Sequence, residues 1–405
     1  MEQEVESVTS ITSARSGNNR EDLRQHNLSV VMNLVHKHRS ISRSEITFRT
    51  GLNRSTTLDL VGELVQLGLV EESEGANSKG VGRPSINVTP VESVVSFSVV
   101  PTKHNVTVAV VSMSGSVLMK ARETTNIFAT ADEVAKVSAD IIAGLRKRLK
   151  PGTRVAGVGV SIPGQVNIST NTVRNSPHLK WIEEPFGLAL EDLVQLPVRL
   201  DNNGSITSAA ERDFGAGRGF ENIVYLLGTD GGIGGGVVMD GKLIRGSTGY
   251  AGELGHMRIS ESKLEDSMGI AGTLEAIVRR TELEDVLGLD DPDDEELSRA
   301  IRTSKSPRVR RTLDRQIELL GIGIANLVNI FNPEVVLLGG FLSDLFNVDD
   351  YKLISQIRRS ALPGAREKVQ IRTAELGANL QIIGAAQLGF SNLLQNPAGA
   401  TLHTP

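Results

Sequence analysis

The 405-residue sequence contains no cysteine, and aromatic residues make up only 3% of it. The absence of cysteine excludes disulfide bonds, thiolate metal sites and cysteine nucleophiles. No stretch reaches the roughly 18–20 consecutive apolar residues that a membrane-spanning helix needs. The first 20 residues are polar and rich in serine and threonine, so they lack the apolar segment of a secretory signal peptide. We therefore expect a cytoplasmic protein that has no membrane partner.

A large excess of one charge is also missing, because 43 basic residues are balanced by 48 acidic ones. Any binding to nucleic acid must therefore come from a local patch and not from the field of the whole protein. What the chain does have is glycine, 41 residues, alongside a hydrophobic content of 39%. This composition predicts a large buried core with many tight turns, and the length fits two or three domains.

Residues 20–90 show the pattern of a helix-turn-helix that is followed by a wing. A helical pattern starts at Arg24, and the next helix is introduced by Ser42 and Glu45, which have the spacing of a capping box. That helix stops at Gly51, a residue type that favours helix ends. The apolar face of the first helix consists of Leu28, Val31, Leu34 and Val35.

A third helix follows, and Asn53 is a suitable cap for its first turn. After this helix, Leu69-Val70 predicts a wing strand and the segment 73–82 predicts a flexible wing tip. The helical spacing of the apolar residues indicates which face is directed toward the core. That face is expected to consist of Leu58, Val61, Leu64 and Val65.

Charge is separated sharply within this region. Residues 24–58 hold six basic residues and one acid, whereas residues 59–74 hold five acids and no base. Such a separation is typical of a surface that faces phosphates, and small hydroxyl residues beside an arginine at a helix N-terminus fit a major groove. Each residue alone would favour the simpler interpretation, a capped surface helix, but the combination favours binding to double-stranded DNA. The predicted DNA contacts are Arg43, Asn53, Arg54, Ser55, Thr56, Thr57 and Arg83.

The pattern changes in residues 91–390, where strands alternate with helices and predict an α/β architecture. Amphipathic helices are expected at 132–149 and 315–330. The two ends of the chain, 1–19 and 391–405, are expected to be a disordered N-terminus and a flexible tail. Runs of apolar and β-branched residues predict strands at 94–100, 106–111, 155–162, 198–200, 223–227 and 335–338.

A glycine-rich segment, 228–236, follows the apolar run 223–227. Dense glycines let backbone N–H groups approach an anion closely, but a tight β-hairpin explains the same residues equally well. Downstream, Glu253 follows a glycine on a strand-like segment, where its carboxylate is suited to accept hydrogen bonds from sugar hydroxyls. A partly buried structural carboxylate is an equally good interpretation, so the residues alone leave both alternatives open.

Several motifs together carry a resemblance to a known family. The N-terminal motifs are Ser42-Arg43-Ser44-Glu45, Gly51-Leu52-Asn53-Arg54-Ser55-Thr56 and Gly82-Arg83-Pro84. The C-terminal motifs are Pro163-Gly164, Asp201-Asn202, the 228–236 segment, Gly252-Glu253-Leu254-Gly255-His256 and Asn332-Pro333-Glu334 with Gly339-Gly340. Over about residues 20–390 the chain resembles the ROK family of repressors, open reading frames and kinases. The resemblance implies a winged helix-turn-helix in front of two actin-like α/β lobes that enclose a ligand cleft.

The resemblance also implies a set of sugar ligands in that cleft. Glu253 and Glu275 are the strongest candidates, since a carboxylate accepts two hydroxyl hydrogen bonds and discriminates between sugar stereoisomers. The complete set, mapped residue by residue, is Gly164 through its backbone, Asn202, Asn203, Glu253, His256 and Glu275.

Two departures from the family's kinases affect catalysis. The kinases carry an Asn-Asp pair whose aspartate is the base toward the sugar hydroxyl, whereas this chain has Asn202-Asn203. A side-chain amide cannot take up the proton. The kinases also open the domain with a glycine-containing phosphate loop, but the corresponding stretch 96–102 has no glycine. We therefore expect no kinase activity, no catalytic residue and no nucleotide cofactor.

A third departure concerns a structural zinc that many family members bind through one histidine and three cysteines. The three cysteine positions are occupied here by Asp266, Met268 and Thr273, while the histidine corresponds to His256. A carboxylate, a thioether and a hydroxyl make a poor tetrahedral zinc site. The sequence therefore predicts that no zinc or other metal is bound.

These expectations combine into a sugar-responsive transcriptional regulator, most simply a repressor of carbohydrate uptake or catabolism genes. It is expected to bind a palindromic operator as a homodimer or homotetramer, with a sugar or sugar phosphate as its effector. An active ATP-dependent sugar kinase that carries a DNA-binding head is the alternative. An activator, or a regulator whose effector is a transport protein, also remains open.

Overall fold

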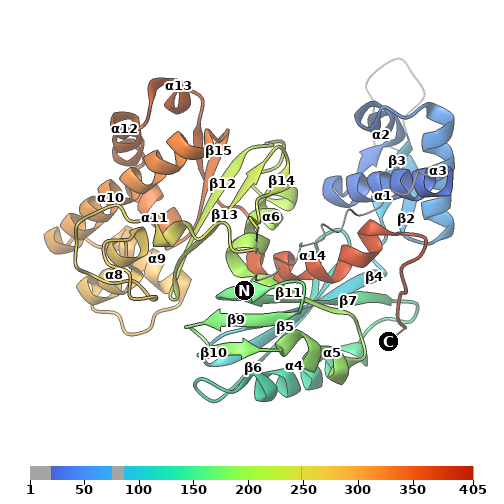
Figure 1. Cartoon of the computed structure of the whole chain (residues 1–405), viewed down its shortest axis with the longest axis horizontal. Coiled ribbons are helices and arrows are strands. Elements are labelled where there is room, and N and C mark those ends of the chain that lie inside the picture. Colours follow the sequence, from blue (N-terminus) through green and yellow to red (C-terminus); the bar gives the residue numbers. More distant parts are fainter. Residues whose placement is uncertain (1–19, 75–85, 248, 405) are drawn as a thin grey trace, which may run out of the picture.

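The computed structural model describes residues 20–74, 86–247 and 249–404, which form a small head and two α/β lobes (Figure 1). The head is the blue region, the first lobe is mostly cyan to green, and the second lobe is mostly yellow to orange. The head and the second lobe lie at opposite ends of the molecule. This arrangement separates the predicted DNA-binding residues from the second lobe.

The head consists of three helices beside a three-stranded sheet in the order β1-β3-β2. Its predicted helix caps are confirmed: Ser42 Oγ accepts a hydrogen bond from Glu45 N (3.1 Å), and Asn53 Oδ1 accepts one from Thr56 N (2.8 Å). Gly51 ends the second helix in the left-handed region, at φ 68°. The elements are α1 (Arg20–His38), β1 (Ile41–Ser42), α2 (Arg43–Thr50), α3 (Arg54–Gln66), β2 (Val70–Glu74) and β3 (Ile86–Pro90).

The predicted core face of α3 is partly wrong. Leu58 and Val65 are 48% and 40% exposed, although both were expected to face the core. The buried face is turned toward Thr57, whose hydroxyl oxygen accepts a hydrogen bond from the Thr47 hydroxyl of α2 (3.1 Å). The sequence interpretation placed Thr57 on the polar side of the helix. Successive residues point in directions that differ by about 100° around the helix axis, so this one assignment rotated the predicted apolar face away from the observed one. The residues that α3 does bury are Thr57, Leu60, Val61 and Leu64.

The first lobe is built on a five-stranded sheet in the order β11-β7-β4-β5-β6, with α4 and α5 against it. Parallel pairs join β11 to β7 and β7 to β4, whereas β4, β5 and β6 are antiparallel. A small antiparallel sheet, β10-β9-β8, adjoins it. The bounds are β4 (Val94–Pro101), β5 (Asn105–Ser112), β6 (Val117–Thr124), α4 (Ala131–Arg146), β7 (Arg154–Ile162), β8 (Gln165–Asn167), β9 (Thr172–Ser176), β10 (Trp181–Glu184), α5 (Phe186–Val194) and β11 (Val198–Asn202).

The second lobe repeats this plan with a sheet in the order β14-β13-β12-β15-β16. All six predicted strands fall within observed strands of the two lobes, which confirms the α/β prediction. No helix in the described part of the chain is both long and apolar enough to cross a membrane. The bounds are α6 (Asn203–Phe214), β12 (Ile223–Thr229), β13 (Gly232–Met239), β14 (Lys242–Leu243), α7 (Leu274–Ile277), α8 (Arg280–Leu287), α9 (Asp294–Thr303), α10 (Pro307–Phe331), β15 (Val335–Gly340), α11 (Phe341–Val348), α12 (Asp350–Ser360), α13 (Pro363–Arg366) and β16 (Gln370–Thr373).

The final helix, α14 (Leu380–Gln395), returns to the first lobe and packs on β7 and β4. The expectation that 391–405 is a flexible tail is therefore wrong for the described residues up to 404. Helix α14 continues to Gln395, and His403 exchanges two backbone hydrogen bonds with Val155 of β7 (2.8 and 2.9 Å). The polar, proline-containing composition of the tail gave no indication of this pairing, because the pairing depends on a distant strand.

Candidate functional site

Asn202 and Gly164, two of the predicted sugar ligands, are brought together at the start of α6. Asn202 is the last residue of β11 and caps α6, because its Oδ1 accepts a hydrogen bond from Ser205 N (3.2 Å). Its amide nitrogen donates to the Gly164 carbonyl (2.8 Å). Asn202 thus fixes both the helix start and the loop that follows β7.

Asn203 is the first residue of α6, and the family resemblance implies that its position corresponds to the kinase base. Its Oδ1 accepts a hydrogen bond from Gly204 N (2.9 Å) and lies across from Gly234 of β13. The side chain is half-buried. An amide in this place can donate to or accept from a hydroxyl, but it has no basic site for the proton that phosphoryl transfer would release.

The glycine-rich segment 228–236 forms a β-hairpin, which was one of the two interpretations open from the sequence. Strands β12 and β13 pair antiparallel up to Thr229 and Gly232, so Asp230 and Gly231 make the turn. The hairpin also fixes a predicted sugar ligand, since Ile233 N donates to Glu275 Oε2 (2.8 Å). Ser267 holds the other carboxylate oxygen of Glu275 through its backbone N–H (3.0 Å) and its hydroxyl (2.6 Å).

Glu253 and His256 lie at the short 3₁₀ helix Leu254–His256, close to Glu275. His256 Nε2 is 3.9 Å from Glu253 Oε2. Burial raises the pKa of Glu253, with the His256 ring opposing this shift and the Glu275 charge adding to it. The structure therefore gathers two carboxylates and an imidazole in one place, a donor and acceptor set that suits several hydroxyl groups.

His256 is held by Asp266, for which the family resemblance implies a cysteine position. Asp266 Oδ2 accepts hydrogen bonds from His256 Nδ1 (2.8 Å) and from the Thr273 hydroxyl (2.9 Å). Its Oδ1 accepts from Met268 N (2.9 Å) and Ile270 N (3.0 Å). Burial opposes ionisation of Asp266, yet these hydrogen bonds lower the pKa of its carboxyl. Burial lowers the pKa of His256, but the Asp266 hydrogen bond and nearby acids outweigh it, so the net shift is upward.

This cluster differs from the histidine and three cysteines that the family resemblance implies for a zinc site. His256, Asp266 and Glu275 offer ligand atoms that lie within 4.8 Å of one another. Both oxygens of Asp266 and both oxygens of Glu275 accept hydrogen bonds from neighbouring residues. The Met268 side chain is 42% exposed, and a thioether is a ligand that zinc sites do not use. Hydrogen bonds to Asp266 hold the turn at 266–273.

The structure reveals one site residue that the sequence interpretation missed. Asp201, directly before Asn202, is buried and accepts a hydrogen bond from Asn202 N (2.8 Å). Its other oxygen lies 2.7 Å from Arg245 Nη1. Burial raises the pKa of Asp201, and the Arg245 guanidinium opposes that shift. The place of Asp201 in the motif gave a signal, whereas nothing in the sequence pointed to Arg245.

Cavities adjoin this site on two sides. A cavity of about 980 Å³ is lined by Asp201 and Arg245, together with Arg174 and Arg199. A smaller one of about 180 Å³ lies beside Glu275 and the β12–β13 turn.

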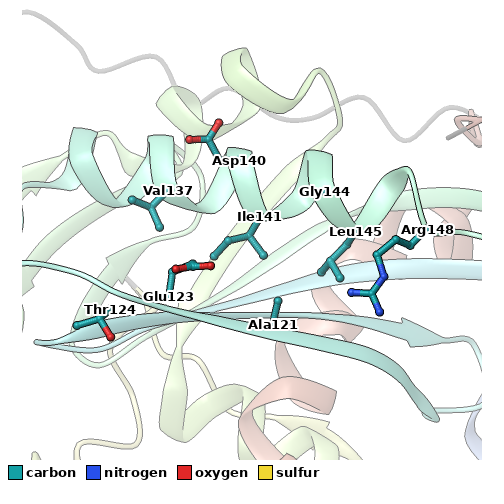
Figure 2. Close-up of a pocket in the computed structure, with 9 residues that line it drawn as sticks. All are labelled: Ala121, Glu123, Thr124, Val137, Asp140, Ile141, Gly144, Leu145 and Arg148. Carbon is teal, nitrogen blue, oxygen red and sulfur yellow. The ribbon is translucent and has the colours of Figure 1, made fainter.

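A third cavity, of about 490 Å³, lies in the first lobe between α4 and β6 (Figure 2). Val137, Ile141 and Leu145 point from α4 toward β6, whereas Asp140 points away. None of the predicted sugar ligands lines this cavity or the cavity of about 980 Å³. The larger cavity does include Asp201, the neighbour of Asn202 in the chain, so we leave only the cavity between α4 and β6 out of the site.

In the head, the predicted DNA contacts have different environments. Arg54 and Ser55 are exposed at the start of α3. Arg43 forms an ion pair with Glu72 of β2, and Asn53 is engaged as the helix cap. Thr56 is half-buried and donates its backbone N–H to that cap, while Arg83 lies outside the described residues.

Thr57 is not available as a DNA contact. It is 1% exposed and hydrogen-bonded to Thr47, so that prediction is wrong. The same error that rotated the predicted core face of α3 also placed Thr57 on the DNA side.

Comparison with known proteins matches both the fold and the organisation of the chain. The xylose repressor of Caldicellulosiruptor bescii is 28% identical over 394 residues, covering 93% of this chain and 98% of the repressor. The glucokinase of Streptomyces coelicolor is 31% identical over 271 residues, covering 62% of this chain and 84% of the kinase.

Among solved structures, a ROK family transcriptional regulator, a homologue of the Escherichia coli Mlc protein, superposes with a TM-score of 0.75. It is 22% identical and covers 92% of this chain and 97% of its own, a likeness that confirms the predicted fold. The model of the ROK family matches residues 102–391, which is well over half of the chain. The chain therefore belongs to the ROK family.

Proposed function

We propose that this protein is a sugar-responsive transcriptional repressor whose kinase-like domain senses the effector without phosphorylating it. One observation carries the proposal: a winged helix-turn-helix head stands in front of a sugar-kinase fold in which an asparagine, Asn203, occupies the base position. The similarity to a xylose repressor extends over 93% of the chain and thus supports the proposal for the head as well as for the lobes.

The effector in this proposal is a neutral sugar or a sugar phosphate. Asn202, Glu253, His256 and Glu275 supply amide, carboxylate and imidazole groups, which match the alternating donors and acceptors of a polyol. Asn203 contributes a further hydrogen bond without acting as a base. We also propose that the turn held by Asp266 needs no zinc.

The proposed partner is operator DNA, contacted by the first turn of α3. Arg54 and Ser55 are the exposed residues there, and an arginine in this position suits either a phosphate or a guanine edge. A palindromic operator would be bound by a homodimer or homotetramer in the cytoplasm.

A sugar kinase with a DNA-binding head is the second candidate, because a glucokinase is 31% identical over 271 residues. Asn203 argues against it, and so does the strand β4, where the stretch 96–102 has no glycine. Ser96 and Ser98 of this strand are fully buried in the sheet, so their hydroxyls cannot contact a phosphate.

A two-part experiment tests the proposal. A thermal-shift screen of free sugars and their 6-phosphates identifies the effector, since a specific ligand stabilises the native state by mass action. DNA selected by the protein from a random library then serves in a binding assay, with ADP release measured alongside. We expect one sugar class to stabilise the protein and weaken DNA binding, without ADP release above background. Sugar-dependent ADP release would instead establish the kinase.

A further inference from the structure

Helix α6 extends from the candidate sugar site to the head. Asn202 caps its first turn, Asn203 is its first residue and Phe214 is its last. Twelve helical residues span about 18 Å at a rise of 1.5 Å per residue. In Figure 1 this helix lies near the centre of the molecule, close to β13 and β14 of the second lobe.

The body of α6 is held tightly on two sides. A side chain at Gly204 would clash with the backbone of Gly235 in β13, so the helix rests directly on that strand. On the other side, a Cβ at Gly384 of α14 would lie only 2.8 Å from the Ile206 carbonyl. Close-packed interiors transmit displacements instead of absorbing them. A shift at the first turn of α6 must therefore move its last turn as well.

The last turn of α6 contacts the last turn of α1 in the head. The Phe214 ring lies edge-on to the His36 ring at 5.4 Å and an interplanar angle of 86°. The Arg39 guanidinium lies 4.9 Å from the centre of the Phe214 ring, and Lys37 Nζ is 3.6 Å from Asp213 Oδ1. Both rings are 2% exposed, so this contact is part of a packed interface and not a surface encounter.

The head is also attached at places that do not belong to the sugar site. Ser29 Oγ and Asn33 Nδ2 donate to the Leu394 carbonyl of α14 (2.7 and 2.9 Å), and Phe390 of α14 packs against His36 at 5.7 Å. Arg154 of β7 donates to the Leu67 carbonyl (3.0 Å). His36 therefore lies between two phenylalanines, of which only Phe214 is on the helix that carries the sugar residues.

We propose that α6 transmits sugar occupancy to the head, with Phe214 as the positioning residue that links it to His36 and Arg39. The inference rests on the proposed function, because it names the route by which that same site regulates DNA binding. Contacts from a sugar to Asn202 and Asn203 displace the first turn of α6. The packed helix carries the displacement to Phe214 and reorients α1, on which α3 is packed.

The test compares Phe214→Leu with Phe390→Leu in the full-length protein. Both replacements remove a ring from His36 and keep an apolar side chain, but only the first lies on the proposed route. The measured quantity is the ratio of DNA affinities without and with the sugar found in the screen. Sugar affinity is measured separately by calorimetry.

We expect the wild type and Phe390→Leu to respond within the roughly 5–150-fold range of typical allosteric coupling. Phe214→Leu should retain wild-type sugar affinity and sugar-free DNA affinity, while its response falls below two-fold. A full response in Phe214→Leu, or an equal loss in Phe390→Leu, would overturn the route. If Phe214→Leu does not fold, Arg39→Met replaces it, because it removes the cation over the Phe214 ring; an unchanged response in this variant would again overturn the route.

A different result separates this route from the function on which it rests. If the wild type binds no sugar, or if its DNA affinity does not change when sugar is added, both the proposed function and the route are refuted. If the DNA affinities of the wild type and of Phe214→Leu change equally when sugar is added, only the route is refuted.

Discussion

The first turn of α6 and the turn at 266–273 are two places where the sequence predicts a departure from the pattern of the family, and the two departures differ in kind. At the first turn of α6, the resemblance implies that Asn203 stands where kinases have an acid, and a side-chain amide has a similar shape but cannot take up a proton. At 266–273 the resemblance implies that Asp266 stands at a cysteine position of a zinc site, and the structure shows its carboxylate accepting four hydrogen bonds. In the proposed function, both changes leave the predicted sugar surface in place.

The comparison assigns a large share of local stability to Asp266. Its replacement in Asp266→Ala leaves the His256 ring, the Thr273 hydroxyl and two backbone N–H groups without their acceptor, and the side chain is fully buried. We expect the free energy of unfolding to fall by about 3 kcal/mol, measured by urea denaturation. Asp266→Asn, which keeps one carbonyl acceptor, should cost less. Equal stability of the wild type and Asp266→Ala would show that these hydrogen bonds do not stabilise the fold. A fall in melting temperature after dialysis against a chelator would show that a bound metal stabilises it.

Glu253 tests the second part of the comparison, which is the predicted sugar surface. Glu253→Gln keeps the size of the side chain but removes the charge, so sugar affinity should fall by roughly 1.5–3 kcal/mol, the typical contribution of hydrogen bonds to a charged group. Calorimetry with the identified sugar measures this change. Glu261→Gln, at an exposed position in the following loop, is the matched control and should bind like the wild type. DNA affinity without sugar should be unchanged, and a Glu253→Gln variant that responds normally would refute the site.

Arg54 tests the head, which the two departures leave untouched. Arg54→Ala should weaken DNA binding by ~1–3 kcal/mol if the side chain reads a base. Arg49→Ala is the control, because Arg49 forms an ion pair with Glu45 within its own helix (2.6 Å) and should matter less. Fluorescence anisotropy at several salt concentrations separates base reading from phosphate contact. Undiminished affinity at all of them would show that α3 does not face the duplex.

The smallest expected effect is the pH dependence that His256 contributes. Its folded-state pKa lies above the ordinary value of 6.5, so the stabilisation is fully present below pH 6.5 and is lost as the pH rises through the folded-state pKa. We expect the difference in unfolding free energy between the wild type and His256→Ala to shrink over that interval. Denaturation at a series of pH values measures it, and a difference that grows with pH would contradict the charged His256–Asp266 pair.

Much of this architecture could be predicted because its signals are local. Ser42, Gly51 and Asn53 cap helices through bonds to residues within four positions, and all three were identified from residue type and spacing. The core strands were identified from apolar runs. Asn202 and Gly164 came from the family resemblance, and the structure joins them by a hydrogen bond.

What could not be predicted depends on contacts between distant segments. Arg43 is paired with Glu72 across the head, and Arg245 with the buried Asp201, although neither pair is close in sequence. The contact of His36 with Phe214 joins the head to the effector domain, and no pattern around either residue indicates it. The prediction for Thr57 failed for a different reason. Its hydroxyl is hydrogen-bonded to the Thr47 hydroxyl, so this polar residue packs in the core.

The central claim is most directly tested by one titration of the wild-type protein. DNA affinity is measured with and without the sugar that stabilises the fold, in the presence of ATP and Mg²⁺, while ADP release is followed in the same sample. The account predicts a roughly 5–150-fold loss of DNA affinity with no ADP release above background. DNA affinity that ignores the sugar, or ADP release that depends on it, would contradict the account.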